Sequence, residues 1–390
     1  MKTIRDFELK DKTVIIRCDF NVPIKDGIIT DDNRIKESLM TIQYALKEGA
    51  KVVLLSHLGR IESEADKVRN TLLPVAKRLE VLLNQPVIFI ASPNGNKMII
   101  EQMKSGVVAL IENTRHQDYP LKLESGNNIE LAKRWAMLGD IFINDAFGAI
   151  HRAHASTVGI AQIIPSGIGF LVEKEVKKLA YINNPKKPFI VILGGAKVKD
   201  KMPLIDNIIF KADYILVGGG IANTFIKAMN IEVGGSLVDE ENLKFCRQLL
   251  DRDFHKIVKP LDFKVATSLE DPNPIICDYN KVPENMNIYD IGPQTVALYA
   301  DYLKKAHTIV WNGTMGVSEH QNYQEGTYQI AKLLSELEAI VIIGGGDTAG
   351  AVIEMGFKDS YTHISTGGGA AIELLEGKEL PGLAAIDQCE

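Results

Sequence analysis

Short apolar runs without polar alternation recur along the chain, and each ends abruptly in a polar or glycine-rich loop. Residues 340–343 are the clearest example, because four β-branched side chains lead into Gly344, Gly345 and Gly346, followed by Asp347. Such a run is typical of a strand buried on both faces of a parallel sheet. The glycines let the backbone approach a ligand closely, and the acid can cap the next helix or bind a cation. Taken alone, this segment is better explained as an ordinary strand-to-helix turn.

The first half of the chain repeats the same event with charged loops. We expect strands at residues 14–16, 52–55, 107–111 and 141–143, and each is followed directly by polar and charged residues. Residues 36–47 and 72–83 carry apolar side chains at helical spacing. Strands that alternate with helices predict a parallel, doubly wound sheet.

Arginine and histidine are concentrated where these strands end. In doubly wound sheets, ligands bind outside the carboxyl ends of the strands. Nine of the eleven arginines lie at or before Arg152, and arginine suits bidentate capture of phosphate or carboxylate. The first half is therefore predicted to hold a small anion, whereas Arg5, Arg69, Arg78 and Arg134 are expected to be solvated surface charges. The predicted anion-binding residues are Arg34, His57, Arg60, Arg115, His151 and Arg152.

The second half repeats the strand with glycine instead of charge. Strands expected at 189–193, 214–217, 308–311, 340–343 and 362–365 all run into loops that contain glycine. Backbone N–H groups in such turns can cradle phosphates, or the turns can lie flat against a base. Lys197 and Lys201 are four residues apart, so a short helical turn would point both at the same phosphates. The alternative for this pair is a solvated helix face.

The organisation expected from length and composition is two α/β domains with a cleft between them. A helix at residues 171–182 leads into an Asn- and Pro-rich stretch at 183–188, which marks a domain boundary. The net charge of −6 argues against a nucleic-acid or anionic-membrane partner. The four cysteines form no CxxC pair, no segment is long enough to span a membrane, and no signal-peptide core is apparent, which favours the cytoplasm.

An anion site in one half and glycine turns with lysines in the other favour phosphoryl transfer between two substrates. That chemistry needs alignment and charge stabilisation, and a carboxylate acceptor needs no general base. A nicotinamide dehydrogenase is a rival hypothesis, but the chain lacks the dinucleotide fingerprint, and it lacks a P-loop as well. A non-catalytic anion-binding protein is a second rival, which leaves Lys197, Lys201 and Asp347 without a role.

Eight motifs in order along the whole chain resemble the phosphoglycerate kinase family. They are RCDFNVP at Arg17, SHLGR at Ser56, ENTRH at Glu112, NDAFGAIHRAHAST at Asn144, LGGAKVKDK at Leu193, WNGTMG at Trp311, GGGDTA at Gly344 and STGGGA at Ser365. The resemblance implies reversible, Mg²⁺-dependent transfer from 1,3-bisphosphoglycerate to ADP in glycolysis, giving 3-phosphoglycerate and ATP. It also implies two doubly wound, Rossmann-like domains. We expect a phosphoglycerate domain at 1–170, a helix and linker at 171–187, a nucleotide domain at 188–372, and a tail at 373–390 that returns to the first domain.

The resemblance also implies roles for single residues. Arg34 would reach the transferring phosphoryl group, Lys197 would follow it between substrates, and Asp347 would bind Mg²⁺. Catalysis is expected from Arg34, Lys197 and the N–H groups of Gly346 and Gly368. The residues expected to bind phosphoglycerate are Asp19, Asn21, Arg34, His57, Arg60, Arg115 and Arg152. Those expected to bind the nucleotide are Gly195, Lys197, Lys201, Gly219, Asn312, Glu319, Gly346, Asp347 and Thr348.

Four positions depart from the family pattern. Thr314 and Ser318 stand where the family usually has proline and phenylalanine, and both are expected to flank the nucleotide pocket. Gln294 often corresponds to lysine, and Ile61 to proline. None of these departures removes a proposed catalytic group. The family implies a monomer whose two half-sites meet by hinge closure, with in-line transfer in a site that excludes water.

Overall fold

Two compact units make up the chain. The structure is a computed structural model that describes residues 1–365 and 367–387. One unit comprises Met1–Lys177 together with Glu379–Glu390, and the other comprises Lys178–Lys378. Thr366 and the last three residues of the expected tail, Cys389 among them, lie outside the described residues.

A six-stranded parallel sheet forms the centre of the N-terminal unit. Its order is β5-β6-β4-β1-β7-β8, and every neighbouring pair is parallel. The expected parallel sheet is confirmed by this pairing, and its central strands β1, β4, β6 and β7 are mostly buried apolar runs. The strands are β1 (Thr13–Arg17), β4 (Lys51–Leu55), β5 (Val87–Ile90), β6 (Val108–Ile111), β7 (Ile141–Asn144) and β8 (Ser166–Ile168).

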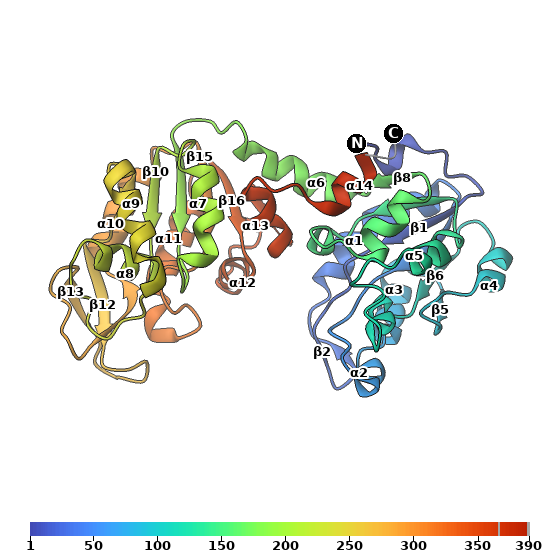
Figure 1. Cartoon of the computed structure of the whole chain (residues 1–390), viewed down its shortest axis with the longest axis horizontal. Helices are drawn as coiled ribbons and strands as arrows, with labels where there is room; N and C mark the ends of the chain where they lie inside the picture. Colours follow the sequence, from blue (N-terminus) through green and yellow to red (C-terminus); the bar gives the residue numbers. More distant parts are fainter. Residues whose placement is uncertain (366, 388–390) are drawn as a thin grey trace. The chain divides into compact units, whose positions relative to one another are not determined.

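Helices cover this sheet, and the C-terminal helix belongs to the same unit. The predicted helices are present as α1 (Asn33–Lys47) and α3 (Leu73–Leu83), with shorter helices α2 (Glu64–Arg69), α4 (Lys97–Gln102) and α5 (Ile129–Ala136). Helix α14 (Pro381–Asp387) contacts β8, beside which Figure 1 shows it, and the helical turn η4 (Ala155–Gly159). The N–H of Gly382 donates to the carbonyl of Ile150 at 2.9 Å, which fixes α14 to this unit.

Helix α6 (Phe170–Leu179) follows β8, and the boundary between the units falls after Lys177. A 3₁₀ turn at Ala180–Ile182 continues it, which agrees with the helix predicted at 171–182. Asp145 caps its start, because one carboxylate oxygen accepts N–H groups from Leu171 at 2.9 Å and Val172 at 3.2 Å. Burial raises the pKa of Asp145 to about 7, and these hydrogen bonds oppose the rise.

The C-terminal unit contains a second six-stranded parallel sheet, in the order β11-β10-β9-β15-β16-β17. Its strands are β9 (Phe189–Leu193), β10 (Tyr214–Val217), β11 (Ile257–Val258), β15 (Thr308–Asn312), β16 (Ile340–Gly344) and β17 (His363–Ile364). The helices are α7 (Met202–Ile208), α8 (Gly219–Ala228), α9 (Leu243–Asp253), α10 (Pro293–Leu303), α11 (Glu325–Ser335), α12 (Gly346–Glu354) and α13 (Gly369–Leu375). Trp311 and Tyr299 are fully buried in the core of this unit.

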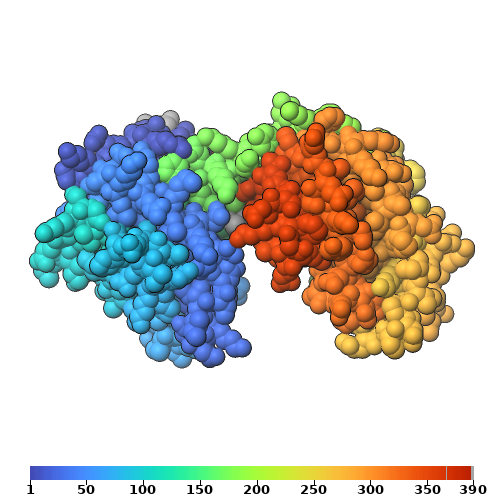
Figure 2. Space-filling view, turned by 180° about the vertical axis from the view of Figure 1, so that it is seen from behind, coloured from blue at the N-terminus to red at the C-terminus, as the bar shows by residue number. Residues whose placement is uncertain are grey.

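A small antiparallel sheet in the C-terminal unit was not predicted. It has the order β13-β12-β14, with strands Ile275–Asp278, Asp262–Ala266 and Asn287–Ile291. Ile275 and Ile276 of β13 are exposed, so this strand lacks the continuous burial that marks the parallel strands. The yellow residues near this sheet lie on the opposite side of the C-terminal unit from the red residues of α12 and α13 (Figure 2).

Across the described ranges, none of the helices combines the length and the apolar composition that a membrane crossing requires.

Candidate functional site

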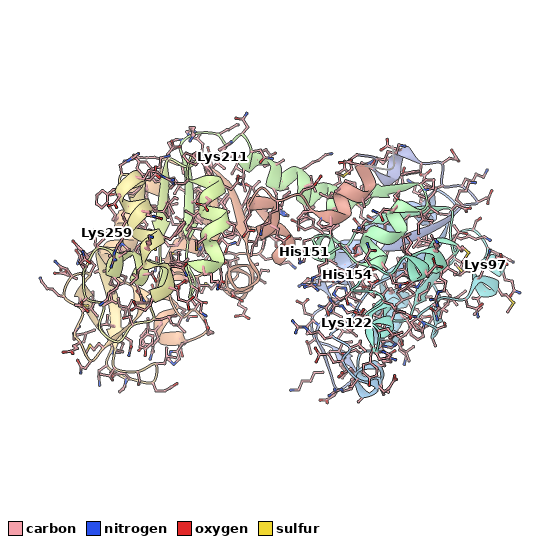
Figure 3. The ribbon with its side chains drawn as sticks, in the orientation of Figure 1. Lys97, Lys122, His151, His154, Lys211 and Lys259 are labelled. Atoms are coloured by element: carbon pink, nitrogen blue, oxygen red, sulfur yellow. The ribbon has the colours of Figure 1, made fainter. Side chains whose placement is uncertain are left out.

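The charged residues of the N-terminal unit gather at the carboxyl ends of its central strands. Arg17 ends β1 and is paired in register with Leu55 of β4 on one side and Asn144 of β7 on the other. The loops that follow β1, β4, β6 and β7 carry the predicted residues, because parallel strands all end at the same edge. In Figure 3, the labelled His151 and His154, which both follow β7, lie near one another in this unit.

Asp19 and Arg34 form an ion pair at this edge. The guanidinium of Arg34 donates to a carboxylate oxygen of Asp19 at 2.7 Å, and Arg34 remains partly exposed in the first turn of α1. Gly148 makes room for the pair, since a Cβ there would lie 2.3 Å from the same Asp19 oxygen. Asp19 therefore holds the arginine in place while leaving part of it available to an anion.

The loop after β4 is fixed by amide side chains and brings Arg115 toward it. Asn21 accepts the N–H of Gly59 at 2.9 Å, and Arg115 donates to the carbonyl of Gly59 at 2.5 Å. Asn113 is fully buried and bonds both the N–H and the carbonyl of Leu58, at 3.1 and 2.7 Å. Asn21, Gly59 and Arg115 thus come from three loops and meet at one point.

His57 is buried under the cationic cluster and faces Arg17. A terminal nitrogen of Arg17 lies 3.1 Å from Nδ1 of His57, and only 5% of the histidine surface is exposed. Burial lowers the pKa of His57 well below its ordinary value, and Arg17, Arg115 and Arg152 lower it further. His57 is therefore a neutral imidazole in this site.

Arg60 and Arg152 complete the cluster on its exposed side. Arg60 and Arg115 line one cavity of about 460 Å³, together with Ile61 and Lys122. Nε of Arg152 lies 3.3 Å from Nε2 of His151, and the charge of Arg152 is felt at both Arg115 and His57. The structure thus brings all seven predicted phosphoglycerate residues to one edge of the sheet.

A cavity of about 1260 Å³ in the C-terminal unit lies among the predicted nucleotide residues. It is lined by the predicted Gly195, Gly219, Glu319, Gly346 and Asp347, and by Tyr289, Thr314, Ser318 and Tyr328. Thr314 and Ser318 flank the pocket as expected, and Gln294 is exposed on α10. The cavity is large enough for a drug-sized or nucleotide-sized ligand.

The first glycine turns pack backbone against backbone. A Cβ on Gly194 would lie 2.0 Å from the carbonyl oxygen of Thr314, and one on Gly313 would lie 2.0 Å from that of Gly194. The N–H of Gly195 already donates to Thr314 at 3.0 Å, and the N–H of Gly219 to Met315 at 2.8 Å. Gly195 and Gly219 therefore offer the cavity a surface without side chains. Because their N–H groups are already bonded, this surface suits a flat base better than a phosphate.

Lys197 and Lys201 differ in the structure, so the expected shared helical turn is wrong. Only Lys199–Lys201 forms a 3₁₀ turn, and Lys197 lies before it, exposed to solvent. Lys201 is partly buried and its ammonium group donates to the side-chain oxygen of Asn312. Burial lowers the pKa of Lys201, and nearby Asp200 and Asp347 oppose this. Lys201 is therefore held by Asn312 with Asp347 nearby, whereas Lys197 is exposed to solvent.

Helix α12 begins at Gly346 and presents Asp347 in its first turn. Gly345 precedes the helix with φ +88°, a conformation that glycine adopts without strain. Thr348 accepts the N–H of Gly313 at 2.6 Å, which ties this turn to the end of β15. Gly368, with φ +49°, makes the corresponding turn before α13. Free N–H groups at a helix start and an exposed carboxylate suit a phosphate chain with its cation.

The donor set at Asp347 fits Mg²⁺ only as part of a metal–nucleotide complex. Within residues 1–365 and 367–387, no group of three or more His, Cys, Asp or Glu side chains could hold a metal ion. Magnesium is commonly held by one or two carboxylates together with substrate phosphate oxygens, and it keeps several waters. A single carboxylate beside a phosphate-sized turn matches that pattern.

Three buried residues of the N-terminal unit were missed by sequence reasoning, namely Arg17 as a site residue, Glu124 and Ser156. All three are fully buried and connected to His57 through hydrogen bonds. A charged residue at the end of the apolar run 14–16 was a signal for Arg17. Nothing local marks Glu124, because its partner Ser156 lies 32 residues away.

Comparisons with known proteins agree with one another over the whole chain. The sequence model for phosphoglycerate kinase matches residues 4–378. Phosphoglycerate kinase from Staphylococcus aureus (strain bovine RF122 / ET3-1) is 50% identical over 391 residues, which cover 99% of each chain. A phosphoglycerate kinase structure from Coxiella burnetii matches with a TM-score of 0.90 and 39% identity, covering 100% of this chain and 99% of that one. One from Pyrococcus horikoshii OT3 has a TM-score of 0.85 and 35% identity, covering 99% and 98%.

Proposed function

The chain belongs to the phosphoglycerate kinase family, and from this membership we propose how its residues carry out the reaction. The enzyme transfers a phosphoryl group between 1,3-bisphosphoglycerate and ADP in glycolysis, with 3-phosphoglycerate and ATP as products. The observation that carries the assignment of residues is that an arginine cluster and a glycine-lined cavity each lie at the carboxyl ends of a parallel sheet.

The N-terminal cluster binds the phosphoglycerate. Its ligand carries a phosphate and a carboxylate, and arginine recognises both by paired hydrogen bonds. Asp19 supports this role by pairing with Arg34 at 2.7 Å, which leaves the rest of the guanidinium for the acyl phosphate. The assigned residues are Asp19, Asn21, Arg34, His57, Arg60, Arg115 and Arg152.

The C-terminal cavity binds the nucleotide. Gly195 and Gly219 line the part suited to the base, and Glu319 is assigned to the ribose hydroxyl groups. Lys201 and Thr348 are assigned to the phosphates of the nucleotide. Lys201 donates to the side chain of Asn312, and Thr348 accepts the N–H of Gly313. Asp347 is assigned to Mg²⁺, which would offset phosphate charge when it is bound with the nucleotide.

The chemistry requires few groups beyond these. A β-phosphate oxygen of ADP attacks the acyl phosphate in line, and the leaving carboxylate needs no proton. Arg34 and Lys197 stabilise the charge on the transferring group, with the N–H groups of Gly346 and Gly368. The two bound substrates must meet, so hinge closure completes the site and excludes water from the acyl phosphate.

The remaining expectations are part of the same proposal. The enzyme acts on small molecules, as a cytoplasmic monomer without nucleic-acid or membrane partners. The net charge of −6 supports the absence of a polyanion partner, since such partners attract basic surfaces.

A coupled assay tests the proposal. Purified protein with 3-phosphoglycerate, ATP and Mg²⁺ should drive oxidation of NADH by the glycolytic dehydrogenase that consumes 1,3-bisphosphoglycerate. Omission of either substrate should abolish the signal. Absence of turnover with all components present would contradict the kinase assignment, and an unchanged rate in EDTA would contradict the assignment of magnesium.

A further inference from the structure

Arg17 is a buried cation that the reaction scheme does not use. It is fully buried, and it ends the central strand β1 directly beneath the phosphoglycerate cluster. Its Nε donates to the hydroxyl oxygen of Ser156 at 2.8 Å, one terminal nitrogen donates to the carbonyl of Cys18, and the other meets Nδ1 of His57 at 3.1 Å. A guanidinium in such a position is costly unless its charge is compensated.

Glu124 supplies that compensation through Ser156. The carboxylate is fully buried and accepts both the N–H of Ser156, at 3.0 Å, and its hydroxyl group. Because both of these groups donate, they favour the ionised carboxylate. Burial raises the pKa of Glu124, and Arg17 and Ser156 oppose that rise. The hydroxyl of Ser156 thus links carboxylate to guanidinium within the interior of the unit.

The direction of the hydrogen bond to His57 settles the state of the imidazole. Arginine can only donate, so the nitrogen that it meets must be unprotonated. Nδ1 faces Arg17, and a neutral ring therefore carries its proton on Nε2. We infer that Arg17, held by Ser156 and Glu124, is a positioning residue that keeps His57 as the neutral Nε2–H tautomer, ready to donate to the bound phosphoglycerate.

The surroundings of His57 reinforce this state. The charged and titratable groups that act on His57 are Arg17 from β1, Arg115 after β6, and Arg152 and His154 after β7, and all four lower its pKa. His154 is itself neutral near pH 7, because burial and the same arginines lower its pKa to about 3. The substrate therefore meets a fixed dipole at His57 rather than a charge that changes with pH.

The donation to phosphoglycerate rests on the proposed function, whereas the tautomer does not. This separates two failures, because the tautomer is visible in ligand-free protein by nitrogen-15 spectroscopy of the histidine rings. His57→Gln identifies the His57 signals by their loss. A wild-type spectrum with protonated Nε2 and bare Nδ1, unchanged from pH 5.5 to 8, is the expected result. Protonation on Nδ1, or a doubly protonated ring in that range, would overturn the inference.

Arg17→Met tests the cause of the tautomer. It removes the donor and the charge but keeps an unbranched side chain, and we expect His57 to populate both tautomers and to titrate between pH 5 and 8. The KM for 3-phosphoglycerate should rise roughly tenfold, as for one lost hydrogen bond, while the KM for MgATP stays unchanged. Arg134→Met, at an exposed position on α5, is the matched control and should leave both unchanged.

A His57 spectrum identical in wild type and folded Arg17→Met would contradict the positioning role. If Arg17→Met does not fold, Ser156→Ala provides the second test, since it cuts the link between Glu124 and Arg17 while removing only a hydroxyl group. It should broaden or split the His57 signals, and an unaltered spectrum would again count against the role. Loss of turnover in the wild type with the predicted tautomer present would refute the proposed function alone.

Discussion

The two proposed half-sites, one in each unit, differ in the kind of group that lines them. In the N-terminal unit, the groups proposed to bind the anion are side chains, and buried side chains contact them, as Arg17 contacts His57 and Asp19 pairs with Arg34. In the C-terminal unit, glycines such as Gly195, Gly219 and Gly346 line part of the cavity and present backbone there. The contrast suits the ligands, since a small, highly charged anion needs directed cations whereas a base needs a flat apolar surface.

This difference changes what a substitution does. In the N-terminal cluster, truncating an exposed arginine removes a contact without opening a cavity in the core. In the C-terminal turns, adding a single methyl group affects either folding or binding, depending on where its Cβ would lie. A Cβ at Gly194 meets backbone at 2.0 Å, whereas a Cβ at Gly346 meets nothing within 4 Å.

The largest expected effect is that of Arg34→Ala. We expect kcat to fall by about 100- to 1000-fold, in the range known for loss of one transition-state charge donor. ADP affinity should remain near the wild-type value, because the cation lies in the other unit. Steady-state kinetics in the coupled assay measure kcat, and calorimetry measures the affinity for ADP. Arg134→Ala is the control for loss of one positive charge, and an equal loss of ADP binding in Arg34→Ala would contradict the division of roles.

A smaller pair of effects separates the two kinds of glycine. Gly346→Ala should leave the free energy of unfolding unchanged and raise the KM for MgATP by roughly tenfold, because its methyl group would occupy the space of a phosphate-facing turn. Gly194→Ala should cost about 1–3 kcal/mol of unfolding free energy, since its Cβ cannot fit without backbone movement. Denaturant unfolding and steady-state kinetics on both variants test this. A destabilised Gly346→Ala with normal KM would show that the turn is structural only.

Much of this site could be predicted because its residues follow the strands directly. Arg115 and His57 each lie within a few residues of a buried apolar run, so the geometry of a parallel sheet was enough to gather them. The same argument placed Asp347 at the start of α12. It identified where the candidate site residues lie, since the ends of parallel strands are set by local sequence pattern.

What could not be predicted depends on distant partners or on backbone detail. Arg17 reaches Ser156 across 139 positions of sequence, and no local pattern announces such a pair. Loop packing decides two further details. Lys197 lies outside the helical turn, and the N–H groups of Gly195 and Gly219 donate to backbone carbonyls. The antiparallel sheet was missed because strand β13 is short and its apolar side chains, Ile275 and Ile276, are exposed.

The most direct test of the divided site is calorimetric titration of Asp347→Ala with each substrate in turn. Asp347 is exposed at the start of α12, so its removal should leave the fold intact. We predict that MgADP affinity falls by roughly tenfold or more, as for one lost charged contact, while 3-phosphoglycerate affinity matches the wild type. Unchanged MgADP affinity, or an equal loss of 3-phosphoglycerate affinity, would contradict the account.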